Sequence, residues 1–155
     1  MADKHLLIVA HAPSDNTRRL VDAVIRGARH PDIEGVVVTW KPPLEAQPAD
    51  VLQADAIILG TTENLGYMSG ALKDFFDRCY YPVLEKKQGL PCALYIRAGL
   101  DGTGTRRAVQ SIVSGLRWQW VQEPLVFKGD WQDAFVDQAQ ELGLTLAAGL
   151  ETGIF

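Results

Sequence analysis

Short apolar runs alternate with amphipathic segments along the whole chain, and this alternation is the feature that most restricts its fold. The apolar runs are rich in β-branched residues, which is typical of strands buried on both faces. Between them, apolar residues recur at spacings of three and four, which predicts helices. We expect strands over residues 6–10, 36–39, 56–59, 92–96 and 118–127, the last one bent or interrupted at Pro124.

The helical patterns follow the strands in regular order. They predict helices over about residues 17–28, 49–53, 70–82, 106–115 and 132–148. Strands and helices that alternate in this way form parallel sheets with right-handed crossovers and helices on both faces. The fold class that we predict is therefore α/β, a three-layer, doubly wound, five-stranded parallel sheet in a single domain, residues 1–155.

Composition narrows the class of protein further. Apolar residues make up 47% and charged residues 22% of the 155 positions, as in soluble globular proteins. A net charge of −4 argues against a dedicated nucleic-acid binder. Neither a signal-peptide pattern nor a run of transmembrane length occurs, so we expect a cytoplasmic protein without membrane association. Cys79 and Cys92 lie in apolar segments and are expected to be reduced core residues. The three histidines, His5, His11 and His30, are too scattered to indicate a metal site.

The stretch from Ala54 to Arg78 holds the most informative joint between a strand and a helix. After the apolar run 56–59 we expect a loop from Thr61 to Ser69, with Ser69 capping the helix that follows. Nine residues are long for such a joint, which usually has two to six. In open α/β sheets ligands bind at the carboxyl ends of the strands, so this loop is a candidate binding site.

The segment from Gly60 to Gly70 resembles the isoalloxazine-binding loop of flavodoxin-like, NAD(P)H-dependent FMN and quinone reductases. Gly66, Met68, Ser69 and Gly70 match the family pattern, and Thr62 replaces its usual proline. The resemblance implies strand order 2-1-3-4-5, FMN as cofactor and NADH or NADPH as reductant. A receiver domain is the competing five-stranded fold, but the acidic positions that it needs hold His11 and Gly60 instead.

A second candidate loop, residues 11–17, precedes the first predicted helix. The free amides and the dipole at a helix start can bind a phosphate, and Ser14, Asn16 and Thr17 add neutral donors. We expect Asn16 to cap this helix. Asn16 and Thr17 match the flavodoxin phosphate loop, whereas Asp15 takes the place of its glycine. His11 is the only histidine placed at this ligand-binding edge, so we predict a phosphate contact for it as well; a capped surface loop without a ligand is the alternative.

The resemblance also implies which residues hold the flavin ring. Gly66 would let the backbone approach the flavin N5 closely, since it lacks a side chain. Tyr67 would stack over the ring or form part of a subunit contact, and Glu63 would disfavour an anionic reduced flavin nearby. The ring contacts predicted in this way are Thr61, Thr62, Glu63, Asn64, Leu65, Gly66, Tyr67 and Met68, with Ala98, Gly99 and Gly102 from the loop after the fourth strand.

The function that we favour is an FMN-binding, NAD(P)H-dependent oxidoreductase that passes hydride through the flavin to a quinone, a free flavin or a similar small-molecule acceptor. Two alternatives stay open: a flavodoxin-type electron carrier, which the modest charge disfavours, and a flavin-free interaction module. Residues 121–130 contain no histidine, so no proton donor can be assigned. The resemblance implies a homodimer or tetramer. The four tryptophans are expected to pack at strand ends and in the core.

Overall fold

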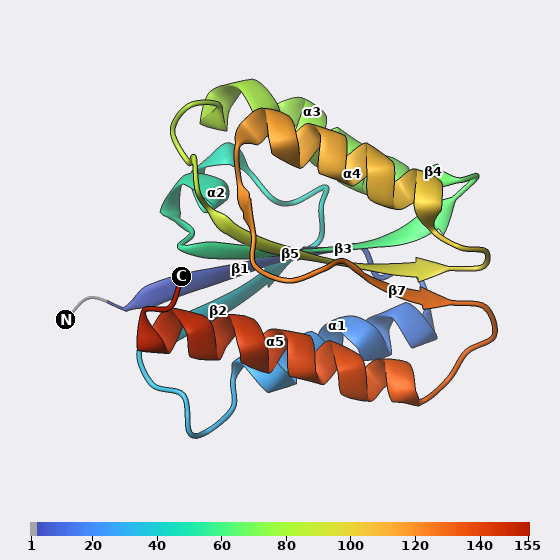
Figure 1. Cartoon of the computed structure of the whole chain (residues 1–155), viewed down its shortest axis with the longest axis horizontal. Helices are drawn as coiled ribbons and strands as arrows, with labels where there is room; N and C mark the ends of the chain where they lie inside the picture. The colour runs from blue at the N-terminus through green and yellow to red at the C-terminus, as the bar shows by residue number, and fades with distance from the viewer. Residues whose placement is uncertain (1–2) are drawn as a thin grey trace.

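A parallel sheet divides the protein into two helical layers (Figure 1). The computed structural model describes residues 3–155. Its strands are β1 (Lys4–Ala10), β2 (Val36–Lys41), β3 (Ala56–Asn64), β4 (Tyr67–Met68), β5 (Pro91–Ala98), β6 (Gln119–Trp120) and β7 (Leu125–Lys128). All of them pair in parallel except β4, which folds back antiparallel on the end of β3.

The order of the strands across the sheet is β2-β1-β3-β5-β6, and β7 also pairs with β5. Gln119 lies opposite Pro91 and Leu125 lies opposite Tyr95, so β6 and β7 follow each other along the same edge of β5. They are two pieces of one strand, interrupted before Leu125 as Pro124 predicts. With β5 counted as the fourth strand and β6 with β7 as the fifth, the predicted order 2-1-3-4-5 is confirmed.

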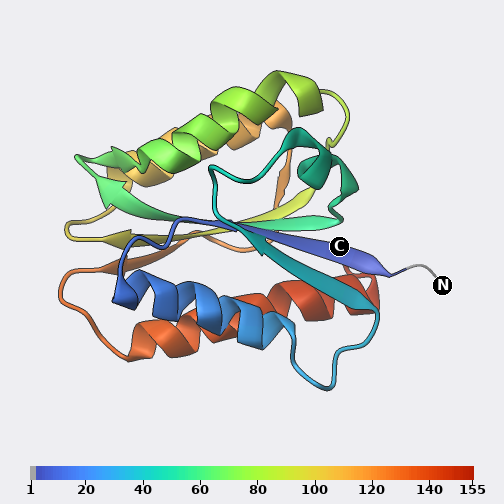
Figure 2. The same cartoon turned by 180° about the vertical axis from the view of Figure 1, so that it is seen from behind.

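Helices cover both faces of this sheet (Figure 2). One face carries α1 (Asp15–Ala28) and α5 (Ala134–Thr152), and the other carries α2 (Pro48–Gln53), α3 (Gly70–Val83) and α4 (Thr103–Leu116). Successive side chains of a strand point to opposite faces. In β1, Leu6 and Ile8 therefore pack with the α1 and α5 layer, whereas Leu7 and Val9 join the core beneath α3 and α4.

Glycines let α1 and α5 pack with their backbones in close approach. A β-carbon at Gly27 would overlap the carbonyl oxygen of Gln140, and one at Gly143 would overlap the carbonyl oxygen of Val24. The two helices therefore approach more closely than larger residues would permit. This contact fixes α1 against α5 and thereby also fixes the loop that precedes α1.

Several predicted helix ends differ from the structure. Ser14, not Asn16, caps α1, because its hydroxyl accepts from the Thr17 amide. Pro82 lies inside α3, since the Leu84 amide still donates to the Tyr80 carbonyl, 2.9 Å away, and continues the helix past the proline. The fourth helix ends at Leu116, where Arg117 adopts the left-handed conformation, and the last helix continues to Thr152.

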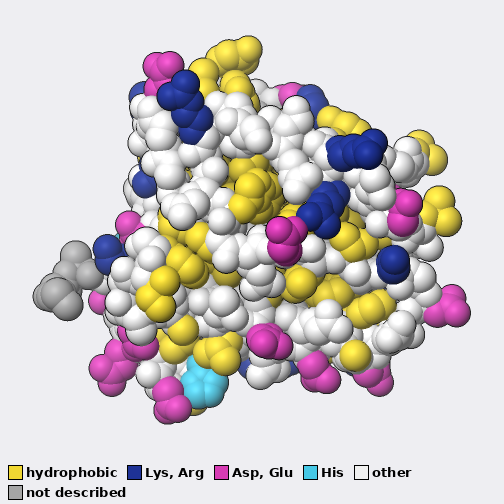
Figure 3. Space-filling model, in the orientation of Figure 1, with side chains coloured by type: hydrophobic (Ala, Val, Ile, Leu, Met, Phe, Trp, Pro, Cys, Tyr) yellow, Lys and Arg dark blue, Asp and Glu magenta, His cyan; other side chains and the backbone are white. Residues whose placement is uncertain are grey.

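The two cysteines are free thiols within the core, as predicted. Burial raises the pKa of Cys79 to about 11 and that of Cys92 to about 12, so both thiols stay protonated at neutral pH. None of the helices in residues 3–155 is long and apolar enough to cross a membrane. On the face shown in Figure 3, apolar side chains gather between the two helical layers, along the edge formed by β6 and β7.

Replacement of Gly143 by alanine should destabilise the fold, because the added methyl group collides with the backbone of α1. We expect the free energy of unfolding in urea to fall by about 1–3 kcal/mol, as is typical of overpacking. The matched control is Gly70→Ala, a helical glycine with open space around its α-carbon, which should leave the unfolding free energy unchanged or slightly raised. Equal effects of the two substitutions would contradict the close packing of α1 and α5.

Candidate functional site

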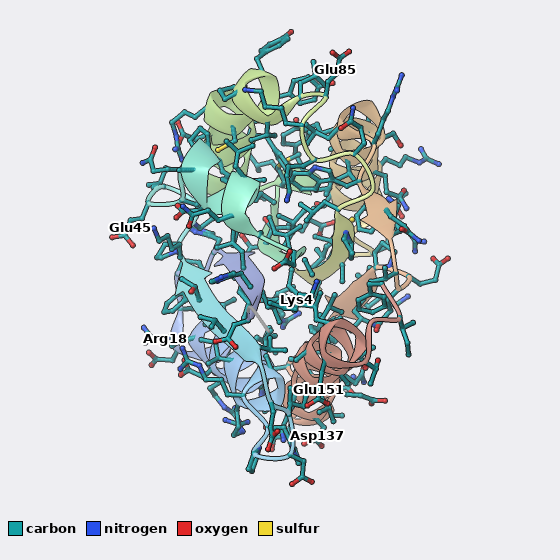
Figure 4. All side chains as sticks on the ribbon, turned by 90° about the vertical axis from the view of Figure 1, so that its left-hand side faces the viewer. Lys4, Arg18, Glu45, Glu85, Asp137 and Glu151 are labelled. Atoms are coloured by element: carbon teal, nitrogen blue, oxygen red, sulfur yellow. The ribbon has the colours of Figure 1, made fainter. Side chains whose placement is uncertain are left out.

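The carboxyl ends of β1, β3, β5 and β7 meet at one edge of the sheet, on the right in Figure 1. The loops that leave this edge are residues 11–14, the β3–β4 hairpin, residues 99–102 and residues 129–133. Figure 4 looks at the opposite edge, where Lys4 begins β1 and Glu151 lies near the end of α5. Since ligands of open α/β sheets bind at carboxyl ends, the candidate site lies at the first of these edges.

The first predicted loop ends in a reciprocal cap at the start of α1. The Ser14 hydroxyl accepts from the Thr17 amide at 3.2 Å, and the Thr17 hydroxyl accepts from the Ser14 amide at 2.9 Å. Thr17 is buried, so its side chain serves the cap. The amides of Asp15 and Asn16 belong to the first turn, which has no acceptors within the helix, and both side chains are exposed. These two amides are the donors that the helix start offers to an anion.

His11 joins the first loop to the central strand. Its amide donates to the carbonyl oxygen of Gly60 at 3.0 Å, so the loop after β1 starts beside the point where β3 enters the hairpin. Burial holds the pKa of the His11 imidazole below its usual value, so the ring is neutral at pH 7. A neutral imidazole can donate one hydrogen bond to an anion without an ion pair.

Two tryptophans flank the start of α1, although the sequence suggested only a packing role for them. The Arg18 guanidinium lies 4.8 Å from the Trp40 ring, and the Trp40 indole donates to the carbonyl oxygen of Ala10 at 3.1 Å. On the other side, Arg19 lies 5.1 Å from the Trp131 ring. Both indoles thus hold a cation next to the first turn of α1. The signal in the sequence was the position of Trp40 near the end of β2 and of Trp131 in the loop after β7.

A third cation, Arg97, reaches the same edge from β5 and was not predicted as a site residue. Its guanidinium lies 5.8 Å from the Trp131 ring and donates to the carbonyl oxygens of Ala98 and Phe127, at 2.8 and 3.0 Å. These bonds tie the ends of β5 and β7 together. Arg97 directly follows the apolar run of β5. A charged residue at the carboxyl end of a buried strand was the feature of the sequence that could have indicated a site residue.

The segment after β3 is a hairpin, so the prediction of a loop from Thr61 to Ser69 was wrong. β3 continues to Asn64, and Asn64 pairs with Tyr67 across a two-residue turn. Leu65 and Gly66 have φ angles of 53° and 76°, as a type I′ turn requires at both central positions. The polar residues of this segment and a leucine in the left-handed conformation concealed the hairpin from a reading of the sequence.

Buried polar groups fix the base of this hairpin. Thr61 is 1% exposed, and its hydroxyl accepts from the Ser69 amide at 3.0 Å. The Ser69 hydroxyl in turn accepts from the Leu72 amide at 3.1 Å, which confirms the predicted cap of α3. Met68 is buried in the core beneath α3 and α4. The hairpin is therefore attached firmly to α3, while its tip projects into solvent.

The third predicted loop lies against the hairpin. The Glu63 carboxylate accepts from the Leu100 amide at 3.1 Å and from the Gly102 amide at 2.8 Å. Gly102 has a φ of 69° and caps α4, whereas Gly99 is exposed with open space at its α-carbon. Glu63 was predicted to disfavour an anionic reduced flavin near it; in the structure both of its carboxylate oxygens accept from backbone amides. Arg106, in the first turn of α4, pairs with Glu123 at the surface.

The structure brings all three predicted groups of site residues to one edge. An apolar rim surrounds the hairpin tip, since Leu65 and Leu100 are 107% and 79% exposed and Tyr67 is partly exposed. The start of α1, with its free amides and adjacent arginines, lies one strand away across the β1–β3 pair. The arrangement suits a ligand with an anionic group at one end and a flat, partly apolar body at the other.

Comparison with known proteins places this chain in a well-populated fold. Residues 19–132 match the sequence model of the family described as NADPH-dependent FMN reductase. A curated protein named flavodoxin, from Aquifex aeolicus (strain VF5), is 31% identical over 111 residues, which are 72% of this chain and 59% of that protein. The match thus spans less than two thirds of the curated relative.

Solved structures agree with this match in fold. A flavodoxin from the domain Archaea has a TM-score of 0.79 at 18% identity, over 94% of this chain and 98% of that one. The flavodoxin, WrbA-like protein from Agrobacterium tumefaciens has a TM-score of 0.73 at 19% identity, over 97% and 99%. At such identities the likeness concerns the fold alone.

Substitution of Thr61 by valine should weaken the base of the hairpin. Valine keeps the shape of threonine but leaves the buried Ser69 amide without its acceptor. We expect the free energy of unfolding to fall by about 1–3 kcal/mol, the usual cost of a buried unsatisfied donor, as measured in urea. Thr62→Val is the matched control, because the Thr62 hydroxyl bonds only the exposed Asn64 side chain. The account is wrong if the two variants unfold alike.

Proposed function

The chain belongs to the NADPH-dependent FMN reductase family, and from this premise we propose that it is an NAD(P)H-dependent flavin or quinone reductase. Membership confirms, at the level of the family, the predicted FMN cofactor and the nicotinamide reductant. A quinone, a free flavin or a similar small molecule is the electron acceptor that we propose. Bound FMN would supply the redox chemistry, accepting hydride from the nicotinamide and passing it on.

One observation carries this proposal: an anion-binding helix start and an exposed hairpin lie side by side across the β1–β3 pair. The FMN phosphate would bind at the start of α1, where the Asp15 and Asn16 amides and the Ser14 and Asn16 side chains offer neutral donors. The His11 imidazole would add one more hydrogen-bond donor to the phosphate. Arg18 and Arg19, which pair with Asp22 and Asp133, follow closely in the chain, and the Asp15 side chain is exposed.

The ring of the cofactor would lie against the hairpin and the loop after β5. Gly66 and Gly99 both have open space at their α-carbons, so their backbone groups can approach a flat ligand closely. Tyr67, being partly exposed, is available to cover one face of the ring. The chain thus orients the ring and shields it, and residues 121–130 offer no histidine as a proton donor.

A flavodoxin-type electron carrier is the second candidate, since the curated relative at 31% identity bears that name. The two functions differ in how fast a nicotinamide cofactor reduces the bound flavin. A carrier needs a partner protein for this step, whereas a reductase must bind the nicotinamide itself. The third candidate, a flavin-free interaction module, requires a site that holds no flavin.

We further propose that the chain acts as one domain in the cytoplasm, without nucleic acid as a partner. The two buried, reduced cysteines support a reducing compartment, and the net charge of −4 does not favour nucleic acid. The apolar rim of Leu65, Tyr67 and Leu100 supports a homodimer or tetramer in which a second copy covers the site.

Purified protein should bind FMN at least about tenfold more tightly than riboflavin, because only FMN carries the phosphate that the start of α1 would hold. Quenching of flavin fluorescence measures both dissociation constants. Anaerobic addition of NADPH or NADH should then bleach the bound flavin within seconds.

Each other result points to a named alternative. Tight FMN binding with slow bleaching by both nicotinamides favours the electron carrier. Equal affinity for FMN and riboflavin contradicts the phosphate site at α1. A protein that binds neither flavin is the interaction module, and the proposed function is then wrong.

A further inference from the structure

We propose that Glu63 is a positioning residue that clasps the loop after β5 to the β3–β4 hairpin and so fixes the two walls against which the ring binds. The inference rests on the proposed function in so far as the ligand is a flavin. The clasp itself is a feature of the chain alone. Neither the family match nor the related proteins assign a role to this carboxylate.

Both oxygens of the Glu63 carboxylate are engaged in the contact. One accepts from the Leu100 amide at 3.1 Å and the other from the Gly102 amide at 2.8 Å. Hydrogen bonds to an ionised acceptor are about twice as strong as neutral ones. The pair joins two segments that are 37 and 39 residues apart in the chain. A bidentate bond of this kind fixes orientation as well as distance.

A backbone contact beside the carboxylate supports the same arrangement. A β-carbon at Gly104 would overlap the carbonyl oxygen of Gly66, so the hairpin tip lies directly on the first turn of α4. Gly102, whose amide donates the shorter bond to Glu63, is also the N-cap residue of this helix. The carboxylate therefore lies where the helix dipole favours a negative charge.

Packing alone does not hold the two tips together. Leu65 and Leu100, the apolar residues of the tips, project almost entirely into solvent. The Asp101 carboxylate accepts from the Thr103 amide at the start of α4, at 3.0 Å, and makes no bond to the hairpin. Among the described residues, Glu63 is therefore the one side chain whose hydrogen bonds join the loop 99–102 to the hairpin. Without it, only the backbone contact of Gly104 with Gly66 would hold this region against the hairpin.

The clasp changes what the charge of Glu63 does in the site. A carboxylate that faced the ring would repel an anionic ligand. The Glu63 carboxylate instead accepts from two amides and so stabilises the position of the loop 99–102. Removal of Glu63 is thus expected to weaken FMN binding by releasing the loop, not to strengthen it by removing a charge. The direction of the change in FMN affinity therefore distinguishes a positioning role of Glu63 from competition with the ligand for the two amides.

Three variants test the clasp: Glu63→Ala, Glu63→Gln and, as matched control, Asp101→Ala. The control removes a carboxylate of the same loop whose bond goes to the start of α4 and not to the hairpin. Hydrogen exchange of the Leu100 and Gly102 amides, followed by NMR in the FMN-free protein, reports on the clasp directly. Fluorescence quenching gives the dissociation constant of FMN for each variant.

In Glu63→Ala we expect both amides to exchange at least about tenfold faster and the FMN dissociation constant to rise about tenfold. Glu63→Gln keeps one acceptor oxygen and should restore much of the affinity together with the protection of one amide. Asp101→Ala should bind FMN within about twofold of the unmodified protein. If Glu63→Ala does not fold, the glutamine variant decides the same question with both readouts.

Other outcomes overturn the inference. Unchanged protection of both amides in the Glu63 variants shows that the carboxylate does not hold the loop. Equal or tighter FMN binding by Glu63→Ala shows that Glu63 competes with the ligand or is irrelevant to it. If the unmodified protein binds no FMN, the proposed function fails and the exchange rates alone decide the clasp.

Discussion

The parallel pairing of β1 with β3 is the constraint on which the site depends. These two strands lie next to each other, but the chain leaves β1 toward α1 on one face and leaves β3 toward α3 on the other. Their loops therefore diverge and open the edge of the sheet between them. The bond from the His11 amide to the Gly60 carbonyl marks the point of divergence. The helix start proposed to bind the phosphate and the hairpin proposed to bind the ring become neighbours only through this pairing.

The core beneath that edge is built to keep it rigid. The ring of Tyr95 lies over the α-carbon of Gly60. A β-carbon at this position would overlap the ring, so only glycine fits there. Tyr95 is followed by Phe127 at a centroid distance of 6.1 Å, and Phe127 stacks on Phe135 at 5.2 Å. This aromatic row connects β3 through β5 and β7 to α5. The packing of this aromatic row in the α1 and α5 layer thus fixes the strand ends from which the loops extend.

The fold could be predicted from the sequence because its signal is local and repeated. Each β-branched run stands for one buried strand, and Pro124 even marks the interruption between β6 and β7. The hairpin could not be predicted, since its strand β4 has two residues and exists only through its pairing with β3. A left-handed Leu65 is likewise permitted by the turn and not favoured by its own side chain.

The site was predicted in part for a similar reason. Its loops follow strands, and residues such as Ser14 and Gly66 carry recognisable turn and cap chemistry. The roles of Glu63, Arg97 and Trp131 depend on contacts with residues distant in sequence, and no spacing reveals such contacts. Glu63 is an example. Its charge suggested repulsion of an anionic flavin, whereas its hydrogen bonds to the Leu100 and Gly102 amides connect the hairpin to the loop after β5.

The central claim is that one ligand spans the start of α1 and the hairpin across the β1–β3 pair. A titration of ¹⁵N-labelled protein with FMN, followed by amide chemical shifts, tests it most directly. The account predicts large shifts for the amides of Asp15, Asn16, Gly66 and Gly99 together, at one common dissociation constant. Gly35 and Gln88, at the opposite edge of the sheet, should not move. Shifts confined to one of the two loops, or centred on the opposite edge, would contradict the account.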